Sequence, residues 1–378
     1  MLVTLSATAL LGQSMPSVRT AALRGFASST PSSAMAHQSA SASTAAAAGI
    51  IDESNPFGFK WHRSMIRSKD PAASVKYYQE RYGLTLVDVY HLPALGRSNY
   101  FLASLREGES RDLPEPGTGE AHERLFDMEH SCVELQHEHS DGGASDVRYC
   151  SGNDEPYRGF GHLAFLTDDV YKASKDLEKA GVDFKKRPDE GRMKGLAFAY
   201  DPDGYYIELV PRDKEANHPE PYNLGQTMLR VKDVEKTLDF YTGEGGLGMT
   251  KICELHFDNF SLYFLQSLTP RERETLPPPD SPLAYAWMKR SWAPVLELTH
   301  NHGTEKDEHF KYHDSNTEPR GFGYLGFIVD DVDGASKLLL SKGTDEIPEP
   351  SIFHGKLRRF RDPDGYHVQL AKRKAVLD

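Results

Sequence analysis

The chain has 378 residues, of which 38% are hydrophobic and 10% aromatic, a composition typical of a soluble globular protein with two or three domains. A formal net charge of −12 argues against a nucleic-acid partner, and no apolar run approaches the roughly 18 residues of a membrane span. The three scattered cysteines, Cys132, Cys150 and Cys253, are too few for a disulfide framework or a thiolate metal site and indicate a reducing compartment.

The first 51 residues differ from the rest of the chain in composition. They contain no Asp or Glu, they are rich in Ser, Ala and Thr, and Arg19 and Arg24 supply positive charge. This composition is typical of a transit peptide, and residues 24–28, Arg-Gly-Phe-Ala-Ser, resemble a mitochondrial processing site. We therefore predict a leader over residues 1–51 and a mitochondrial location. A plastid leader and a disordered tail on a cytoplasmic protein are the alternatives.

The spacing of apolar residues indicates the same succession of elements in both halves of the chain. Helical spacing occurs at residues 74–82, 170–180, 234–241 and 332–341, and strand alternation occurs at residues 162–166, 196–200 and 206–210. The turn residues Asp201-Pro202-Asp203-Gly204 join the last two strands. The pattern predicts a strand, a helix and then several strands, twice in each half.

An internal repeat organises the chain. Residues 64–70, Ser-Met-Ile-Arg-Ser-Lys-Asp, recur at 227–233 as Thr-Met-Leu-Arg-Val-Lys-Asp, at an offset of 163. Three further blocks recur in the same order at offsets of 161 to 163, namely 133–135 at 296–298, 158–161 at 320–323, and 201–205 at 362–366. Such order indicates a tandem duplication. We predict a first domain over 57–212, a Pro-containing linker over 213–222 and a second domain over 223–373.

Four motifs carry a resemblance to a known family. They are Gln226-Thr227-Met228-Leu229-Arg230, Glu297-Leu298-Thr299-His300-Asn301, Arg158-Gly159-Phe160-Gly161-His162 and Met193-Lys194-Gly195-Leu196-Ala197-Phe198. With them, the chain from about Trp61 to Ala371 resembles glyoxalase I of the eukaryotic type, in the vicinal oxygen chelate superfamily. The resemblance implies an α+β fold of tandem glyoxalase domains, in which four βαβββ modules form two curved mixed sheets. It also implies a lactoylglutathione lyase, which isomerises the hemithioacetal of methylglyoxal and glutathione to S-lactoylglutathione through an enediolate.

The four metal ligands of the family map onto both copies of the repeat, but neither copy is complete. The first copy offers Arg63, Glu134, His162 and Glu208, and the second offers Gln226, Glu297, Tyr324 and Gln369. In the family, the first pair of ligands comes from one copy and the second pair from the other. This crossing implies one intact set, His162, Glu208, Gln226 and Glu297, and one degenerate second site, Arg63, Glu134, Tyr324 and Gln369. One imidazole, one amide and two carboxylates suit a divalent ion, with zinc expected and Ni, Co or Mn as alternatives.

The resemblance also implies roles for individual residues. Glu208 is expected to remove the C1 proton of the substrate, and Glu297 is expected to serve the opposite substrate face. The expected substrate-binding residues, with glutathione as part of the substrate, are Arg158, Lys186, Met193, Arg230 and Asn301. The expected wall around the aldehyde-derived group is Met193, Leu196, Phe198, Phe260 and Leu262. Because one chain holds both copies, we expect a monomer whose partner is this small-molecule substrate.

Plainer interpretations compete with some of these roles. Without the family, Lys185 to Arg187 indicate a solvated face, the Asp-Pro-Asp-Gly segment indicates turn chemistry alone, and Glu134 indicates an outward-facing strand residue. His62, beside Arg63, is an alternative ligand for the second site. In that site Arg67 and Arg320 keep the anchor positions, while Glu138 replaces the Asn.

Two other functions are compatible with the same fold. A ring-cleaving dioxygenase needs two His and one carboxylate around iron, but only His162 stands at a ligand position. A non-catalytic ligand-binding protein is expected to lose the ligands of both sites, whereas one set is complete. The sequence therefore favours the lyase.

Overall fold

The computed structural model describes residues 52–373, except for 142–146 and 351–354, and the described residues belong to one compact unit. The predicted leader and its processing site lie in residues 1–51, outside the described residues. None of the described helices combines the length and the apolar character needed to cross a membrane. Both predicted copies of the repeat fall within the described unit.

Each copy contains two modules with the order strand, helix and three strands. The first copy contains β1 (Lys60–Arg67), α1 (Pro71–Tyr82), β2 (Thr85–Leu92), β3 (Arg97–Ala103) and β4 (Cys132–Glu138), then β5 (Phe160–Thr167), α3 (Val170–Lys179), β6 (Phe184–Lys186), β7 (Ala197–Tyr200) and β8 (Tyr206–Pro211). The second copy contains β9 (Asn223–Val231), α4 (Val234–Thr242), β10 (Thr250–His256), β11 (Phe260–Gln266) and β12 (Val295–Asn301), then β13 (Phe322–Val329), α7 (Val332–Ser341), β14 (Glu346–Ile347), β15 (Leu357–Arg361) and β16 (His367–Lys372). The predicted helices and strands are confirmed, with small differences at their ends.

Additional helices interrupt two of the modules. They are α2 (Gly119–Asp127) between β3 and β4, and α5 (Pro270–Glu274) and α6 (Pro282–Arg290) between β11 and β12. Short 3-10 turns lie at Pro93–Leu95, His139–Asp141 and Thr304–Lys306. The sequence does carry a start signal for α6, because Ser281 caps the helix by accepting from the amide of Ala284 at 3.2 Å and Pro282 follows it.

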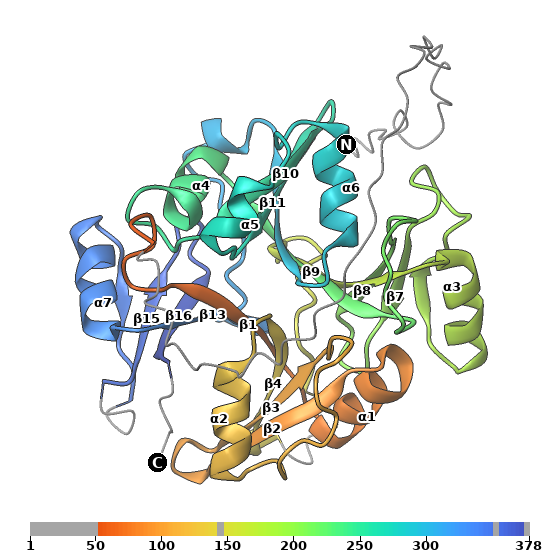
Figure 1. Cartoon of the computed structure of the whole chain (residues 1–378), viewed down its shortest axis with the longest axis horizontal. Helices are drawn as coiled ribbons and strands as arrows, with labels where there is room; N and C mark the ends of the chain where they lie inside the picture. Colours follow the sequence, from red (N-terminus) through yellow and green to blue (C-terminus); the bar gives the residue numbers. More distant parts are fainter. Residues whose placement is uncertain (1–51, 142–146, 351–354, 374–378) are drawn as a thin grey trace, which may run out of the picture. The chain divides into compact units, whose positions relative to one another are not determined.

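The strands form two mixed sheets of eight strands each, in the orders β14-β15-β16-β13-β1-β4-β3-β2 and β10-β11-β12-β9-β5-β8-β7-β6. Each sheet joins one module of the first copy to one module of the second, through antiparallel pairing of β1 with β13 or of β5 with β9. Figure 1 shows this exchange by colour, since orange strands lie beside blue ones in one sheet and cyan strands beside green ones in the other. The α+β architecture of four βαβββ modules is confirmed.

One capping residue recurs in all four modules. Asp70, Asp169, Asp233 and Asp331 each follow an entry strand, and each side chain accepts from backbone amides in the first turn of the following helix, at 2.9 to 3.3 Å. An Asp at this position satisfies amides that have no partner within the helix. The conserved spacing within the repeat thus fixes where each helix begins.

Matching residues of the two copies contact each other between the sheets. Ser64 and Thr227, which are related by the repeat, share a hydrogen bond of 2.9 Å. The rings of Phe160 and Phe322, also related by the repeat, stack with centroids 5.0 Å apart and planes within 5°. A residue that touches its own counterpart lies near a twofold axis. The two halves are therefore related by an internal pseudo-twofold axis.

Two matched arginines tie the copies together. Arg67 donates to three backbone carbonyl groups in the segment 315–322, and Arg230 donates to three in the segment 152–160. Each also donates to an Asn side chain at 3.0 Å, Arg67 to Asn316 and Arg230 to Asn153. Each copy thereby orders the loop that precedes an entry strand of the other.

The Asp-Pro-Asp-Gly segments do more than form turns. The buried Asp201 carboxylate accepts from the amides of Asp203 and Tyr205 at 3.0 and 2.8 Å, and also from the Tyr78 hydroxyl of α1 at 2.8 Å. Asp362 makes the corresponding bond with Tyr241 of α4 at 2.9 Å. The interpretation as turn chemistry alone is wrong, because each turn also fixes a helix that lies more than 100 residues earlier in the chain.

Candidate active site

Four predicted metal ligands lie on one face of the second sheet. Gln226 on β9 is in register with Ala164 on β5, and Ala164 is in register with Glu208 on β8. His162 lies two residues before Ala164 on β5. On β12, Val295 is in register with Gln226, and Glu297 lies two residues after Val295. Residues in register, and residues two apart on one strand, point to the same side of a sheet. The crossed set is therefore brought to one face by three strand pairings.

The side chains of this set converge. His162 Nε2 lies 3.1 Å from Glu208 Oε2 and 3.8 Å from Glu297 Oε2, and the three residues offer ligand atoms that all lie within 4.8 Å of one another. All three are buried. The Gln226 Oε1 atom is also buried and has no hydrogen-bond partner among the described residues. Buried polar atoms normally have a partner, so the unpartnered Gln226 Oε1 on this face is a candidate for a fourth ligand atom.

The titration behaviour of the cluster follows from its burial. Burial alone would lower the pKa of His162, but the carboxylates of Glu208 and Glu297 raise it to about 9. Burial also raises the pKa of Glu208, although His162 opposes this shift. Two buried carboxylates around one imidazole create a strongly negative site, which a proton or a cation must compensate. The donor set of one nitrogen and three oxygens fits a divalent metal ion.

Aromatic side chains wall the cluster. The Phe198 ring, one of the predicted wall residues, lies edge-on to His162 with centroids 5.7 Å apart. Tyr285 of the inserted helix α6 was missed by the sequence analysis, because α6 has no counterpart among the predicted elements. Burial, together with the nearby Glu208 carboxylate, raises the pKa of Tyr285 to about 12, so its hydroxyl stays protonated beside the cluster. Thr299 donates to Glu297 Oε1 at 3.4 Å.

Three of the predicted glutathione anchors gather at one end of this sheet. Asn301 Nδ2 donates to the hydroxyl of Tyr312 at 2.8 Å, and Tyr312 lies within the electrostatic reach of both Arg230 and Arg158. The Arg158 side chain is 40% exposed, and it pairs with Glu155 at 3.4 Å. Tyr312 is a neighbour of the anchors that the sequence analysis did not identify. The only feature of the sequence that pointed to Tyr312 is the repeat, because Tyr149 stands at the matching position of the first copy.

The bonds of Arg230 limit what it can offer to a ligand. A guanidinium has five N–H donors, and Arg230 Nη1 and Nη2 already donate to three carbonyl groups and to Asn153. Its Nε–H and one Nη2 hydrogen remain for another acceptor. Arg230 therefore orders the segment that carries Arg158 and presents one side to the anchor region.

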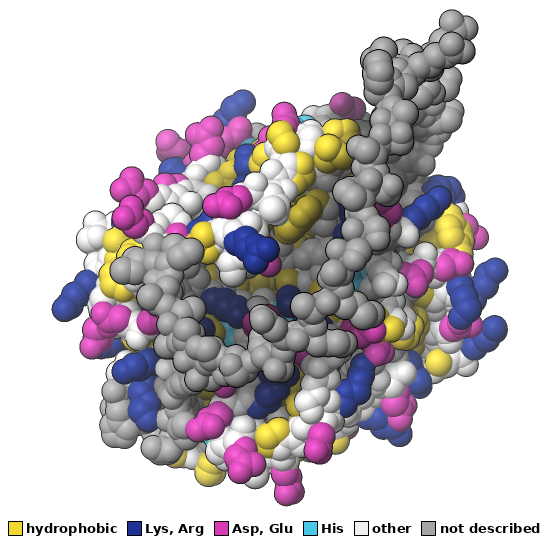
Figure 2. Space-filling model, viewed as in Figure 1, with side chains coloured by type: hydrophobic (Ala, Val, Ile, Leu, Met, Phe, Trp, Pro, Cys, Tyr) yellow, Lys and Arg dark blue, Asp and Glu magenta, His cyan; other side chains and the backbone are white. Residues whose placement is uncertain are grey.

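Lys186 and Met193 belong to the other side of the site. Lys186 Nζ donates to the carbonyl oxygens of Met193 at 2.7 Å and Leu196 at 2.5 Å, which holds the connection between β6 and β7 against the end of β6. Burial lowers the pKa of Lys186, and the Glu208 carboxylate opposes this shift. The Met193 side chain is exposed. Positive and negative side chains are interspersed over the described part of the face drawn in Figure 2.

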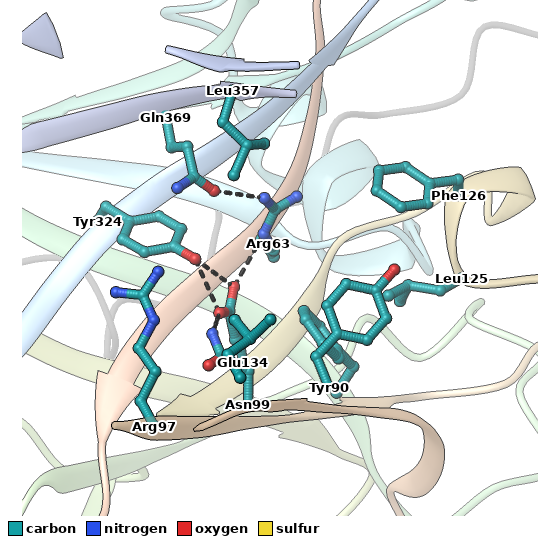
Figure 3. A pocket seen from close by; sticks show the side chains of 12 residues that line it. Arg63, Tyr90, Arg97, Asn99, Leu125, Phe126, Glu134, Tyr324, Leu357 and Gln369 are labelled. Atoms are coloured by element: carbon teal, nitrogen blue, oxygen red, sulfur yellow. Dashed lines mark hydrogen bonds and ion pairs between the residues drawn. The ribbon is translucent and has the colours of Figure 1, made fainter. Parts of the chain in front are cut away.

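The four residues of the degenerate second site also meet, on the other sheet (Figure 3). Arg63 Nε lies 2.8 Å from Glu134 Oε2, and Arg63 Nη2 donates to Gln369 Oε1 at 2.6 Å. The Tyr324 hydroxyl lies 2.7 and 2.8 Å from the two Glu134 oxygens, and Asn99 Nδ2 donates to the same carboxylate. Glu134 is therefore a buried ion-pair partner and not the outward-facing strand residue of the plainer interpretation.

His62 supports Arg63 in this second site. Its Nε2 lies 2.9 Å from the carbonyl oxygen of Leu125, and its Nδ1 lies 3.1 Å from Arg63 Nη1. Since the guanidinium only donates, Nδ1 accepts and Nε2 carries the proton. Burial and the Arg63 charge lower the pKa of His62 to about 3, which keeps the ring neutral. Both ring nitrogens are occupied, so the alternative that His62 is a displaced metal ligand is wrong.

Comparison with known proteins relates this architecture to a family. The model of the Glyoxalase/Bleomycin resistance protein/Dioxygenase superfamily matches residues 60–209 and 223–370. The chain is 34% identical to glyoxalase I of Saccharomyces cerevisiae over 317 residues, which cover 82% of this chain and 91% of that protein. It is 32% identical to lactoylglutathione lyase of Schizosaccharomyces pombe over 333 residues, which cover 84% of this chain and 97% of that protein. The crystal structure of glyoxalase I from Zea mays matches with a TM-score of 0.56 and 25% identity, covering 84% of this chain and 93% of that one.

Proposed function

The chain belongs to the Glyoxalase/Bleomycin resistance protein/Dioxygenase superfamily, and from this premise we propose that it is a lactoylglutathione lyase, a glyoxalase I of the double-length form. Its reaction converts the hemithioacetal of methylglyoxal and glutathione into S-lactoylglutathione. The observation that carries the proposal is the buried cluster of His162, Glu208 and Glu297, with ligand atoms within 4.8 Å of one another. A cluster of this kind can hold a divalent metal ion and supply a general base, and the isomerisation requires both.

The cluster and Gln226 form the proposed metal site. The unpartnered Gln226 Oε1, the imidazole of His162 and the two carboxylates make up a set of four donors suited to zinc, and Ni, Co or Mn are accepted by similar donors. When bound, a divalent ion supplies Lewis-acid stabilisation of negative charge on the two adjacent oxygens of the substrate. The two glutamates balance its charge.

The side chains of the chain supply the proton transfers. Isomerisation moves a proton from C1 of the hemithioacetal to C2, and the C1 hydroxyl proton passes to the C2 oxygen. Glu208, on the strand next to His162, is the proposed base that takes the C1 proton and the acid that delivers a proton to C2. Glu297 approaches from the other side of the cluster. Because Glu208 and Glu297 are buried and Phe198 lies against His162, the site is proposed to limit exchange of the transferred proton with bulk water.

Glutathione is proposed to lie along the cationic groups at the two ends of the site. Arg158, the open side of Arg230 and Asn301 form one carboxylate-binding end. Lys186, beside the connection that contains Met193, forms the other end. Arg gives bidentate recognition of a carboxylate, whereas Lys acts as a point charge. The tripeptide carries two carboxylates, so the spacing of these groups selects for it over a simple thiol.

The protein is proposed to act as a monomer. Both contributors to the site lie on one chain, and the contacts of Ser64 with Thr227 and of Phe160 with Phe322 are internal to it. A covalent link raises the effective concentration of the two halves to about the millimolar range. Activity per chain should therefore not fall on dilution.

The activity is tested by thioester formation. The purified protein is supplied with methylglyoxal and glutathione, and the ultraviolet absorbance of the thioester is followed before chelation, after chelation, and after restoring Zn, Ni, Co or Mn singly. We expect activity that disappears on chelation and returns with metal, at one catalytic metal per chain. Tight metal binding with no thioester formation would instead favour a non-catalytic member of the superfamily, and oxygen consumption with a catechol would favour the dioxygenase.

A further inference from the structure

The second site is a pocket with a polar floor and an apolar wall. Arg63, Arg97, Asn99, Glu134, Tyr324 and Gln369 form the polar part, and Tyr90, Leu92, Phe101, Leu125, Phe126 and Leu357 form the apolar part. Figure 3 shows the polar side chains pointing toward one another, with the apolar side chains to one side. The proposed reaction does not use this pocket.

The repeat shows how this pocket departs from the catalytic one. Arg97 stands where the other half has Phe260, and Asn99 stands where it has Leu262. Arg359 stands where it has Phe198, and the strand registers agree, because Arg359 faces Gln369 as Phe198 faces Glu208. The apolar wall predicted for the catalytic site has thus been replaced by two guanidinium groups and an amide. These changes lie beyond the lost metal ligands and favour a different ligand.

Guanidinium groups surround Tyr324. The Arg63 and Arg359 Cζ atoms lie 5.8 and 5.2 Å from the centre of the Tyr324 ring, and Figure 3 shows Arg97 beside it. Glu134 is fully engaged by Arg63, Tyr324 and Asn99, as described above. Arg359 Nε lies 2.8 Å from a carboxylate oxygen of the buried Glu349 side chain. Guanidinium groups carry only donors, so a ligand at this floor must present acceptor oxygens.

The pocket also contains one buried acceptor, which requires a hydrogen-bond donor. Asn99 Nδ2 donates to Glu134, and this orientation is fixed because the carboxylate only accepts. The Asn99 Oδ1 atom is therefore the one turned away from Glu134. It is buried and has no hydrogen-bond partner among the described residues. A buried acceptor of this kind is satisfied by a hydroxyl or N–H group of a ligand or water.

We propose that the second site binds a short 2-hydroxycarboxylate. Its carboxylate lies against Arg97 of the pocket lining and against the Nη groups of Arg359, whose guanidinium lies over the Tyr324 ring and pairs with Glu349 through Nε. Its hydroxyl donates to Asn99 Oδ1, and its carbon chain contacts the apolar wall near Phe101 and Leu357. Arg63 does not take part directly, because it neutralises Glu134 and holds Gln369. The site thus recognises a small organic acid where its counterpart holds a metal and a larger thiol adduct.

Binding of lactate by the full chain tests the proposal, with propionate as the matched ligand that lacks the hydroxyl. Dissociation constants are measured by titration with detection of the methyl signals by NMR. We expect lactate to bind more tightly than propionate. The double substitution Arg97→Phe with Arg359→Phe, which introduces the residues of the other half, should weaken lactate by about tenfold or more, since charge-assisted hydrogen bonds are lost. Asn99→Leu should abolish the preference for lactate while leaving propionate unchanged.

The controls separate this site from the rest of the molecule. Arg271→Ala removes one exposed charge from α5 and should leave lactate binding unchanged. Thioester formation should be normal in the variants. Arg359→Phe leaves the buried Glu349 carboxylate without its ion-pair partner and should lower thermal stability, so Arg97→Gln alone provides the binding comparison if the double variant does not fold. Equal lactate affinity in the wild type and in the arginine variants, or no binding by the wild type, would overturn the proposal. Equal affinity for lactate and propionate would overturn the assignment of Asn99.

Discussion

The two sheets share one backbone plan but use it for different electrostatics. In the sheet centred on β5 and β9, one imidazole, one amide and two carboxylates lie on one face, and His162 is the basic side chain that pairs with the carboxylates among the described residues. In the sheet centred on β1 and β13, one glutamate is kept and the Arg63 guanidinium lies 2.8 Å from it. The first site must be compensated by a proton or a cation, whereas the second carries a guanidinium of its own.

This difference shows how two sites on the same backbone plan can compensate a buried glutamate in different ways. A buried carboxylate without a partner is costly, so Glu134 requires a cation or hydrogen-bond donors beside it. Arg63 supplies that charge, Tyr324 and Asn99 supply hydrogen bonds, and Gln369 removes the second negative charge. Protein side chains thus compensate the buried glutamate of this site.

The largest expected effect concerns the proposed base. Glu208→Gln should lower kcat by about a hundredfold or more, because the general base is lost, while binding of a glutathione analogue largely survives. The matched control is Gln369→Glu, which makes the reverse change at the corresponding position of the second site and should leave kcat nearly unchanged. Thioester formation measures both variants. Near-normal kcat in Glu208→Gln would refute the assignment of the base.

The retained glutamates give a second comparison. Glu297→Ala should lower activity by at least about tenfold, the scale at which even the outer partners of a metal ligand act. Glu134→Ala should leave activity nearly intact but lower the free energy of unfolding by about 3–5 kcal/mol, because Arg63 is left buried without its carboxylate. Activity assays and urea denaturation on the same samples measure both quantities. Equal losses of activity would show that the crossed assignment of the ligands is wrong.

Restoring the second ligand set sharpens the comparison further. The triple substitution Arg63→Gln, Tyr324→His and Gln369→Glu gives the second site the same four ligand types as the first. Since the strands of both sheets have matching registers, we expect metal content to rise from one to two ions per chain. Metal analysis after dialysis measures this, with Arg63→Gln alone as the control that lacks the imidazole. An unchanged content of one would mean that the backbone of the second site no longer fits a metal.

The smallest effect concerns acid stability. His62 has a pKa of about 3 in the folded protein and 6.5 as its ordinary value, so protonation favours the unfolded chain. Its contribution is complete above pH 6.5 and is lost as the pH falls from 6.5 toward 3. Between pH 7 and 5 the wild type should lose about 2 kcal/mol more than His62→Gln, because each pH unit corresponds to about 1.4 kcal/mol. The matching position in the other half is Gly225, so the sheet centred on β5 and β9 has no histidine at this position.

Urea denaturation of metal-free protein at the two pH values measures this difference, since His162 and the other titrating groups are common to both variants. A loss of stability that is the same in the wild type and in His62→Gln would mean that His62 becomes protonated without unfolding the second site. The difference between the two variants thus reports on His62, in the sheet centred on β1 and β13.

The sequence by itself determined the repeat, the module order and the residue types of both ligand sets. Its periodicity located the four helices that Asp residues cap, and the offset of 161 to 163 paired every ligand position with its counterpart. These features depend on residues that are close together in the sequence, so the spacing of residues alone reveals them. The crossing of Gln226 and Glu297 with His162 and Glu208 came from the resemblance, and the strand pairing of β5 with β9 agrees with it.

Only the tertiary structure decided what surrounds these residues. The salt bridge of Arg63 with Glu134 and the position of Tyr285 beside Glu208 join segments that lie 70 or more residues apart, and no periodicity records such contacts. The interpretations of Glu134 as outward-facing and of His62 as a spare ligand were wrong for the same reason. An unpaired buried charge is costly, so a buried charged side chain must have a partner of opposite sign. Which residue is that partner depends on the tertiary packing, and therefore the sequence pattern does not reveal it.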